Sequence, residues 1–240
     1  MAIFVNENNK IVDMFVNVNQ KKKKVISVFV NKENSPIKVY ENVGNETYEI
    51  APENAYTNWD YTLDDKNDIV VLNYYKGSEI DVIVYANYEI NGKVYKTRIK
   101  SNENSDFGTS YMFNASLSIN GDNPKRHIKT IVFKDGIDTS QNTDMSYMFY
   151  MCRSLTNIDF GKIDTSNVKN MCGMFNTCSS LGDLLDISMF NTNCAENMNE
   201  MFYSTIKLKT ILVDQNKWIT TQATTADMFK YCGTQSVTYI

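Results

Sequence analysis

Apolar and polar residues come in blocks along the second half of this chain, and the blocks repeat. A Met-Phe pair marks each repeat, and from the second pair onward the pairs lie 26 or 27 residues apart. The first interval is longer, at 36 residues, and the polar stretch 120–126 (NGDNPKR) is the obvious insertion. The pairs are Met112-Phe113, Met148-Phe149, Met174-Phe175, Met201-Phe202 and Met228-Phe229. A period of this size predicts a solenoid, in which each unit buries its apolar face only by stacking on its neighbours.

Each repeat unit divides into a strand, a polar turn and a short helix. The strand candidates are rich in Ile, Leu, Val and Phe and lie at 129–133, 156–160, 182–187 and 209–213. The turns contain Asp, Thr, Ser and Asn, which can cap a helix, and lie at 138–144, 164–170 and 191–197. Apolar residues at i, i+3, i+4 and i+7 then predict one amphipathic helix per unit. The residues predicted to face the repeat core from these helices are Met145, Met148, Phe149, Met171, Met174, Phe175, Met198, Met201, Phe202, Met228 and Phe229. A methionine stripe can also bind copper, but its core periodicity favours packing.

The two best-formed units resemble a known family of repeats. Residues 137–181 (IDTSQNTDMSYMFYMCRSLTNIDFGKIDTSNVKNMCGMFNTCSSL) are similar to the BspA-like leucine-rich repeat family. The third unit departs from the family pattern at Asn191, where Asp is usual, and the fourth matches weakly. Residues 59–99 resemble the β-rich segment that often precedes these repeats. The resemblance implies a leucine-rich-repeat solenoid that binds other proteins or cells, and it carries over no catalytic residues.

The first 44 residues carry a different repeat. The segments IFVN (3–6), MFVN (14–17) and VFVN (28–31) are separated by turns rich in Asn and Lys, which predicts a small β-meander. Residues 16–40 resemble short strand repeats in tail and baseplate proteins of phages that infect low-GC Gram-positive bacteria. The lysines at 21–24 fit either a solvated turn or a site for anionic wall polymers.

These patterns predict an α+β fold with three regions. Residues 1–44 form a strand repeat that docks on a particle, residues 45–101 form a β-rich segment that caps the solenoid, and residues 102–240 form the leucine-rich repeats. We expect about four strand-turn-helix units in the β/α solenoid.

Composition is that of a folded protein and excludes some partners. Hydrophobic residues make up 42% of the chain and charged residues 22%, with a formal net charge of −4. This net negative charge argues against binding to nucleic acid, because such binding needs concentrated Lys and Arg. The N-terminus shows no secretion signal, and no run of 18 apolar residues predicts a membrane span.

The sequence offers little catalytic chemistry. His127 is the one histidine, so a Ser-His-Asp or Cys-His arrangement would have to use it. The chain has no Walker-type loop, GxGxxG or HExxH motif. The carboxylates of the repeats occupy turn positions without the dense acidic spacing of a calcium loop. We therefore predict no enzyme activity, no cofactor and no metal.

The five cysteines do not form a disulfide framework. Cys152, Cys178 and Cys232 each follow a Met-Phe pair by three residues, whereas Cys172 and Cys194 fall at other positions. No CxxC pair occurs. The repeat phase predicts buried thiols that act as small apolar side chains.

These observations leave a binding protein as the predicted function. Tyr147, Tyr150 and Tyr203 lie away from the Met-Phe stripe and are candidates for surface binding, since tyrosines are common interface anchors. We predict a component of a phage tail or tail-like bacteriocin, located in the particle, that recognises a host surface receptor of glycan, wall polymer or protein. Residues 1–44 would contact other tail or baseplate proteins. The alternatives are a purely structural virion component, oligomeric within the particle, and a bacterial cell-surface adhesin.

Overall fold

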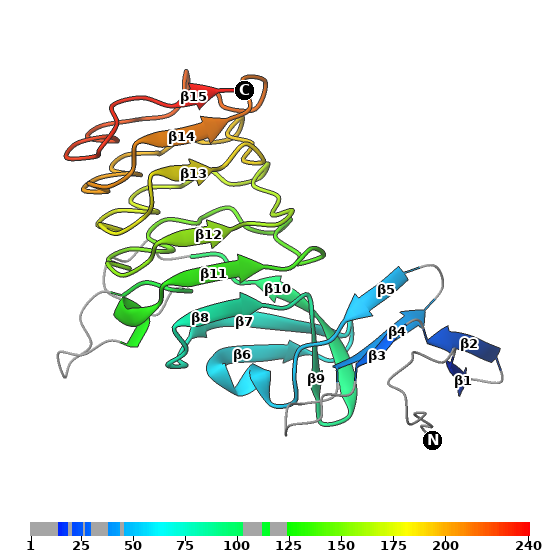
Figure 1. Ribbon diagram of the computed structural model, residues 1–240. Helices are drawn as coiled ribbons and strands as arrows, with labels where there is room; N and C mark the ends of the chain where they lie inside the picture. The colour runs from blue at the N-terminus through cyan, green and yellow to red at the C-terminus, as the bar shows by residue number, and fades with distance from the viewer. Residues whose placement is uncertain are drawn as a thin grey trace.

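The computed structural model describes residues 14–18, 21–25, 27–29, 38–43, 46–102, 112–115 and 124–240, with side chains from Glu49 onward. The strand expected at 3–6, the lysine side chains at 21–24 and most of the insertion at 120–126 lie outside the described residues. Figure 1 shows a β-rich base from which a stack of coils rises toward the C-terminus.

One strand of each coil stacks in parallel on the next (Figure 1). Strand β11 pairs with β12, and β14 pairs with both β13 and β15. Between β12 and β13 the coils are joined by the Gly182 N–H, which donates to the Thr156 carbonyl at 3.0 Å. The strands are β11 (Thr130–Phe133), β12 (Asn157–Asp159), β13 (Leu184–Asp186), β14 (Thr210–Val213) and β15 (Thr238–Tyr239). The four strands expected from the sequence are therefore confirmed as β11 to β14.

The Met-Phe segments form runs of turns instead of helices. Every second N–H donates to a carbonyl of the next coil, as Phe175 does to Met201 at 2.9 Å. The N–H groups between them donate three residues back, as Asn176 does to Gly173 at 3.0 Å. Each coil is left-handed at two positions, with φ of 54° to 63° at Tyr147, Met151, Gly173, Thr177, Glu200, Ser204, Asp227 and Tyr231.

The prediction of one helix per unit is therefore wrong. The described chain contains two 3₁₀ helices, η1 (Ala55–Asn58) and η2 (Pro124–His127), and no α-helix. The α+β class is not confirmed, and the fold is a mostly-β solenoid of stacked coils.

The base is a four-stranded sheet in the order β6-β7-β10-β9. One strand leaves it, because β8 (Asp81–Val84) pairs in parallel with β11 and so begins the solenoid ladder. A second link is the ion pair between Arg98 and Asp138, at 2.7 Å. The sheet strands are β6 (Trp59–Asp64), β7 (Ile69–Tyr75), β9 (Asn87–Ile90) and β10 (Lys93–Ile99).

The N-terminal strands form two small antiparallel sheets beside the base. One contains β1 and β2, and the other has the order β3-β4-β5. The Glu49 carboxylate at the end of β5 pairs with Lys134 at 3.2 Å. The strands are β1 (Met14–Val18), β2 (Lys21–Val25), β3 (Ser27–Phe29), β4 (Lys38–Val43) and β5 (Glu46–Glu49). The meander strands expected at 14–17 and 28–31 correspond to β1 and β3.

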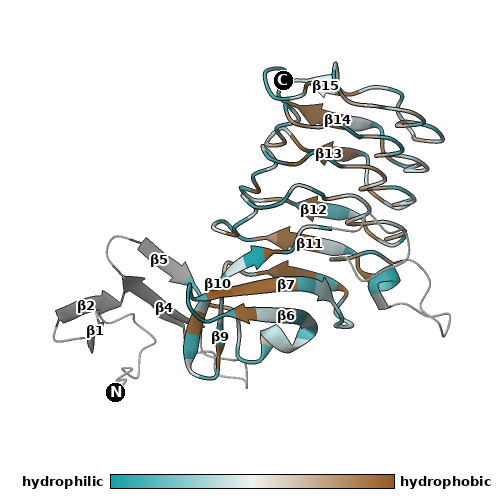
Figure 2. Cartoon of the chain, turned by 180° about the vertical axis from the view of Figure 1, so that it is seen from behind, coloured by the Kyte–Doolittle hydropathy of each residue, from teal (hydrophilic) through white to brown (hydrophobic). Residues whose placement is uncertain are grey.

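Phenylalanine rings run through the solenoid core as a continuous stack. One ring from each coil lies nearly parallel to the next, with interplanar angles of 2° to 11° and centroid separations of 5.5 to 5.7 Å. The stacked rings belong to Phe113, Phe149, Phe175, Phe202 and Phe229. Offset stacking at this spacing is the favourable geometry for aromatic pairs. Figure 2 shows the accompanying hydrophobic residues on β11, β13 and β14.

The predicted repeat-core residues all point into this stack. Ten of the eleven are buried, and Phe229, in the last coil, is partly buried. Cys152 and Cys178 are buried beside them, and each thiol donates to the carbonyl of the preceding coil's phenylalanine at 3.0 Å. These cysteines are therefore hydrogen-bond donors between coils as well as packing groups. All five cysteines are free thiols.

Candidate functional site

The runs of turns present a row of polar and aromatic side chains on the outer face of the coils. Three tyrosines lie on this face, with an amide and a carboxylate between the first of them and the other two. We call it the tyrosine surface and define it as Tyr150, Asn176, Glu200, Tyr203 and Tyr231. The coil-to-coil bonds align these residues, since the Thr177 N–H donates to the Tyr203 carbonyl at 2.8 Å.

Tyr147 lies beneath this surface and is not exposed, contrary to the sequence prediction. Its side chain is only 6% exposed. The ring lies against Gly173 of the next coil, where a Cβ atom would collide with it. Its hydroxyl lies 3.3 Å from the Cys172 sulfur. Burial raises the pKa of Tyr147, and the hydrogen bond to Cys172 raises it further.

The two remaining predicted tyrosines are half-buried and have partners. Tyr150 packs edge-on against Tyr147, with ring centroids 5.5 Å apart. Burial raises the pKa of Tyr150, with a smaller contribution from the negative charge of Glu200. Tyr203 packs edge-on against Tyr231 at 5.4 Å. Tyr231, which is 62% exposed, was not predicted because it lies one residue later in its coil than Tyr150 and Tyr203 do in theirs.

An amide and a carboxylate form the centre of the tyrosine surface. Asn176 is 4% exposed, and its side-chain amide donates to Glu200 at 2.9 Å. The Thr177 hydroxyl donates to the Asn176 side-chain oxygen at 2.7 Å, which fixes the orientation of that amide. The Glu200 carboxylate is thus held between the two tyrosine pairs, ready to accept hydrogen bonds from a ligand.

A second set of polar residues holds the turns in place. The Asp144 carboxylate accepts the Ser146 N–H at 2.8 Å and the Asn170 side-chain amide of the next coil, also at 2.8 Å. Asn170 and Asn197 accept the N–H two residues ahead in the same way, each at 3.1 Å. These residues were predicted to cap helices. They close Asx-type turns instead and link neighbouring coils.

Among the residues that the structure describes, no group of three or more His, Cys, Asp or Glu side chains could hold a metal ion. Burial raises the pKa of the Cys172 thiol, which disfavours the reactive thiolate. The same described residues include no helix long and apolar enough to cross a membrane.

Residues 108–238 match the family described as "Mycoplasma protein of unknown function, DUF285". The chain belongs to this family. The match covers most of the segment in which the sequence predicted BspA-like leucine-rich repeats. The predicted resemblance of residues 16–40 to phage tail proteins has no counterpart in the comparisons.

Two solved structures are similar to this DUF285 chain. One is a leucine-rich cell surface protein from Faecalibacterium prausnitzii A2-165, at 19% identity and a TM-score of 0.43, covering 76% of this chain and 41% of that chain. The other is the leucine-rich repeat protein of T. pallidum, at 12% identity and a TM-score of 0.35, covering 69% of this chain and 72% of that chain. This chain therefore spans less than half the length of the F. prausnitzii protein. No curated protein matches the sequence.

Sequence reasoning missed the centre of the DUF285 tyrosine surface. Asn176 and Glu200 belong to adjacent coils and meet only when the coils stack. The available signal was their position in the repeat, because each lies within two residues of a Met-Phe pair on the side away from the core.

Proposed function

We propose that this DUF285 protein is a non-enzymatic binding protein of the adhesin type that recognises a cell-surface partner through its tyrosine surface. The observation that carries the proposal is the pair of tyrosine clusters held on either side of the Glu200–Asn176 hydrogen bond. Tyrosine side chains are frequent interface anchors. A surface already fixed in place loses little conformational entropy on binding.

The charge of the tyrosine surface favours a neutral ligand. Glu200 lies at its centre, and Asp227 lies at its edge with Lys230 as ion-pair partner, at 3.1 Å. The Glu200 carboxylate disfavours anionic wall polymers, whereas the aromatic rings and the carboxylate can together contact the ring faces and hydroxyl groups of a sugar. A neutral cell-surface glycan is therefore the ligand class we propose.

The particle-borne form of this function requires a second binding region in the chain. It requires residues 1–44 to dock on a phage tail or tail-like bacteriocin, while the solenoid faces the host. The backbone pairing of β1 with β2 and of β3 with β4 provides a small module that could do so. The adhesin-type role needs the tyrosine surface alone, so it is the proposal, and the particle-borne role is its alternative.

Replacing Tyr150 and Tyr203 together with Ala tests the proposal. On an array of neutral and acidic glycans, we expect the parent protein to bind neutral glycans and the double variant to bind at least about tenfold more weakly, the loss of a typical anchor pair. The control is Tyr239→Ala, which removes a tyrosine that is 58% exposed but lies outside the tyrosine surface. Unchanged binding by the double variant, or equal losses in both variants, would contradict the proposal.

A further inference from the structure

The base of the molecule carries a hollow that is separate from the tyrosine surface. Its volume is about 490 Å³, which falls within the range of roughly 300–1,000 Å³ that is usual for small-molecule sites. One wall is the segment that leads into η1, and the other is the end of β9 with the turn into β10. We call it the base hollow.

Backbone hydrogen bonds hold the two walls of the base hollow together. The Ala51 N–H donates to the Asn87 carbonyl at 2.9 Å, which joins the segment before η1 to β9. Glu89 lies within the antiparallel pairing of β9 with β10. Asn91 and Gly92 form the turn between these strands with φ of 54° and 77°, the left-handed angles that a two-residue hairpin turn requires. The walls are therefore formed before any ligand binds.

Two carboxylates and two amides line the base hollow without partners of their own. Glu53 and Glu89 are exposed, and neither forms an ion pair with any residue that the structure describes. The side-chain amides of Asn54 and Asn91 also have no hydrogen-bond partner among those residues. Four polar side chains from two walls thus have their donors and acceptors free for a ligand.

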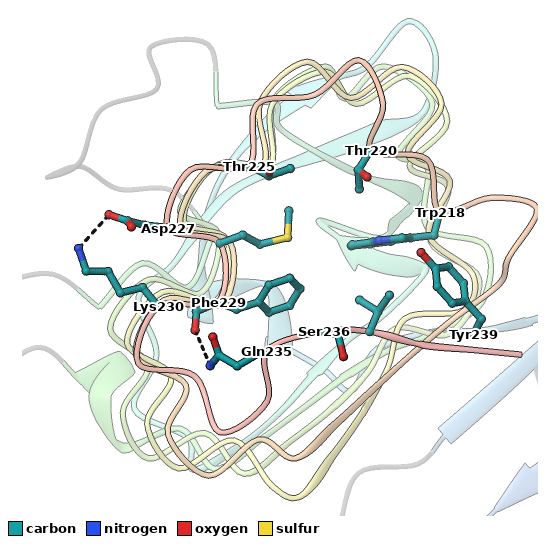
Figure 3. Close-up of a pocket in the computed structure, with 11 residues that line it drawn as sticks. Trp218, Thr220, Thr225, Asp227, Phe229, Lys230, Gln235, Ser236 and Tyr239 are labelled. Atoms are coloured by element: carbon teal, nitrogen blue, oxygen red, sulfur yellow. Dashed lines mark hydrogen bonds and ion pairs between the residues drawn. The ribbon is translucent and has the colours of Figure 1, made fainter.

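The charge of the base hollow favours a cation. None of its described lining residues is basic. Lys93 follows the turn, but its ammonium group lies 2.7 Å from the Asp68 carboxylate and is bound there. The hollow at the last coil differs, because its Asp227 carboxylate pairs with Lys230 at 3.1 Å (Figure 3). The carboxylates of the base hollow have no such counter-charge, so they attract a positively charged ligand.

An aromatic ring completes the lining of the base hollow. Tyr56 is half-buried against the core, and its ring packs edge-on against Tyr61 with centroids 5.8 Å apart. This contact fixes the ring, so little side-chain entropy is lost when a ligand packs on it. An aromatic face attracts cations and packs against apolar groups.

We propose that the base hollow binds an amino sugar whose amine is protonated. The ammonium group would pair with Glu53 and Glu89 through charge-assisted hydrogen bonds. The hydroxyl groups would bond to the amides of Asn54 and Asn91, and the sugar ring would pack on Tyr56. A neutral sugar would leave both carboxylates without a counter-charge, and a simple alkylamine would leave both amides unused. An amino sugar uses all of these groups.

Titration of the full-length protein with D-glucosamine, followed by NMR, tests the proposal. At slightly acidic pH the amine is protonated and the carboxylates are ionised. We expect the amide signals of Asn54, Tyr56, Glu89 and Gly92 to shift. N-acetyl-D-glucosamine, whose nitrogen is uncharged, and n-butylamine, which has no hydroxyl groups, should each bind at least about tenfold more weakly. Equal binding of either compound, or no shift with glucosamine in large excess, would overturn the proposal.

Variants separate the base hollow from the tyrosine surface. Glu53→Gln and Glu89→Gln together remove the negative charge and keep the shape, so they should weaken glucosamine binding at least about tenfold. Glu79→Gln, which neutralises an exposed carboxylate outside the hollow, is the control and should bind as the parent protein does. The Tyr150→Ala and Tyr203→Ala double variant should also bind glucosamine normally. Unchanged affinity in the Glu53 and Glu89 double variant would show that the carboxylates do not hold the amine.

Discussion

One glycine shapes the tyrosine surface more than any other residue. Gly173 occupies a left-handed position that Tyr147, Glu200 and Asp227 occupy in the other coils. A side chain at this φ costs roughly 1–2 kcal/mol in a non-glycine residue. Glycine at 173 avoids this cost and also leaves room for the Tyr147 ring. A helix over this segment would place the Tyr147 side chain in solvent. The left-handed turns place it against the next coil instead, which explains its burial.

A substitution at Gly173 should therefore cost more than backbone strain alone. We expect Gly173→Ala to destabilise the protein by about 2–4 kcal/mol, because it adds overpacking against Tyr147 to the strain. In a Tyr147→Ala background, the cost of the same substitution should fall to about 1–2 kcal/mol, the strain term alone. Denaturant unfolding of the four proteins measures both values.

Gly92 provides the matched control for this experiment. It has a φ of +77°, and a Cβ atom there would meet nothing within 4 Å. Gly92→Ala should show only the strain. Equal costs at the two glycines would mean that Tyr147 does not lie against Gly173.

The buried thiols predict a dependence of stability on pH. Burial raises the pKa of Cys178 well above its ordinary value of 9.0. As pH rises past 9.0, the unfolded chain ionises while the folded chain keeps its proton, so the free energy of unfolding falls. From pH 8 to 10, this loss amounts to about 1.4 kcal/mol for one thiol.

The Cys178→Ala variant isolates that contribution. The variant should be less stable than the parent protein, and denaturant unfolding under reducing conditions measures the difference in free energy of unfolding. We expect this difference to decrease by about 1.4 kcal/mol between pH 8 and 10. A deficit for Cys178→Ala that stays constant across this range would contradict a raised pKa.

At the scale of the elements, the strands were predictable and the turn runs were not. A strand such as β14 has a compact apolar signal, and its length and Ile, Leu and Val content settle its identity. The Met-Phe segments place i, i+3, i+4 and i+7 inward whether they form a helix or a run of turns. The deciding hydrogen bonds join residues 24 to 29 positions apart, such as Asn176 with Glu200 and Cys178 with Phe149. Local spacing carries no information about them.

Threonines in the polar turns should contribute measurably to the joining of coils. Thr165 is buried, its hydroxyl donates to the Asn191 carbonyl at 3.0 Å, and it accepts the Asn191 N–H at 2.7 Å. Thr139 and Thr192 make equivalent bonds in their own coils. Thr165→Val keeps the shape but leaves these backbone groups without a partner.

We expect Thr165→Val to cost about 1–3 kcal/mol, the usual penalty for a buried polar group that loses its hydrogen bond. The Asn191 amide should also exchange faster with solvent, which distinguishes a lost bond from a packing defect. Asn157→Ala, on the exposed face of β12, is the control and should stay within about 0.5 kcal/mol of the parent protein. If the two variants are equally stable, the threonine does not link the coils.

At the scale of the whole molecule, the two ends of the ring stack differ. At the base, Trp59 and Tyr75 of the four-stranded sheet pack on the Phe113 ring. At the other end, Phe229 has one uncovered face. This difference could not be predicted from the sequence, because it depends on which side chains pack on the first and last rings of the stack. Tyr150 and Tyr203 could be placed by repeat phase, whereas their arrangement around Glu200 depends on the stacking of coils.

We expect the molecule to divide near residue 45. Residues 45–240 contain the base sheet, the solenoid and the whole tyrosine surface, and lack β1 to β4. A solenoid draws its stability from contacts between neighbouring units and from its caps. We therefore expect a protein of residues 45–240 to unfold cooperatively in a thermal melt, to remain soluble and to bind the same glycans as the full chain. If the particle-borne alternative holds, this shortened protein should fail to join the particle.

Deletion of the terminal coil provides the matched comparison, since residues 1–223 would leave the Phe202 ring uncovered and free a new row of four N–H groups. That deletion should lower the melting temperature by several degrees, because it removes a coil-to-coil junction and the packing around Met228. The loss of residues 1–44 should lower it less. If residues 45–240 fail to fold while 1–223 stays intact, the N-terminal strands are part of the structural core. Their predicted role as a separate docking module would then be wrong.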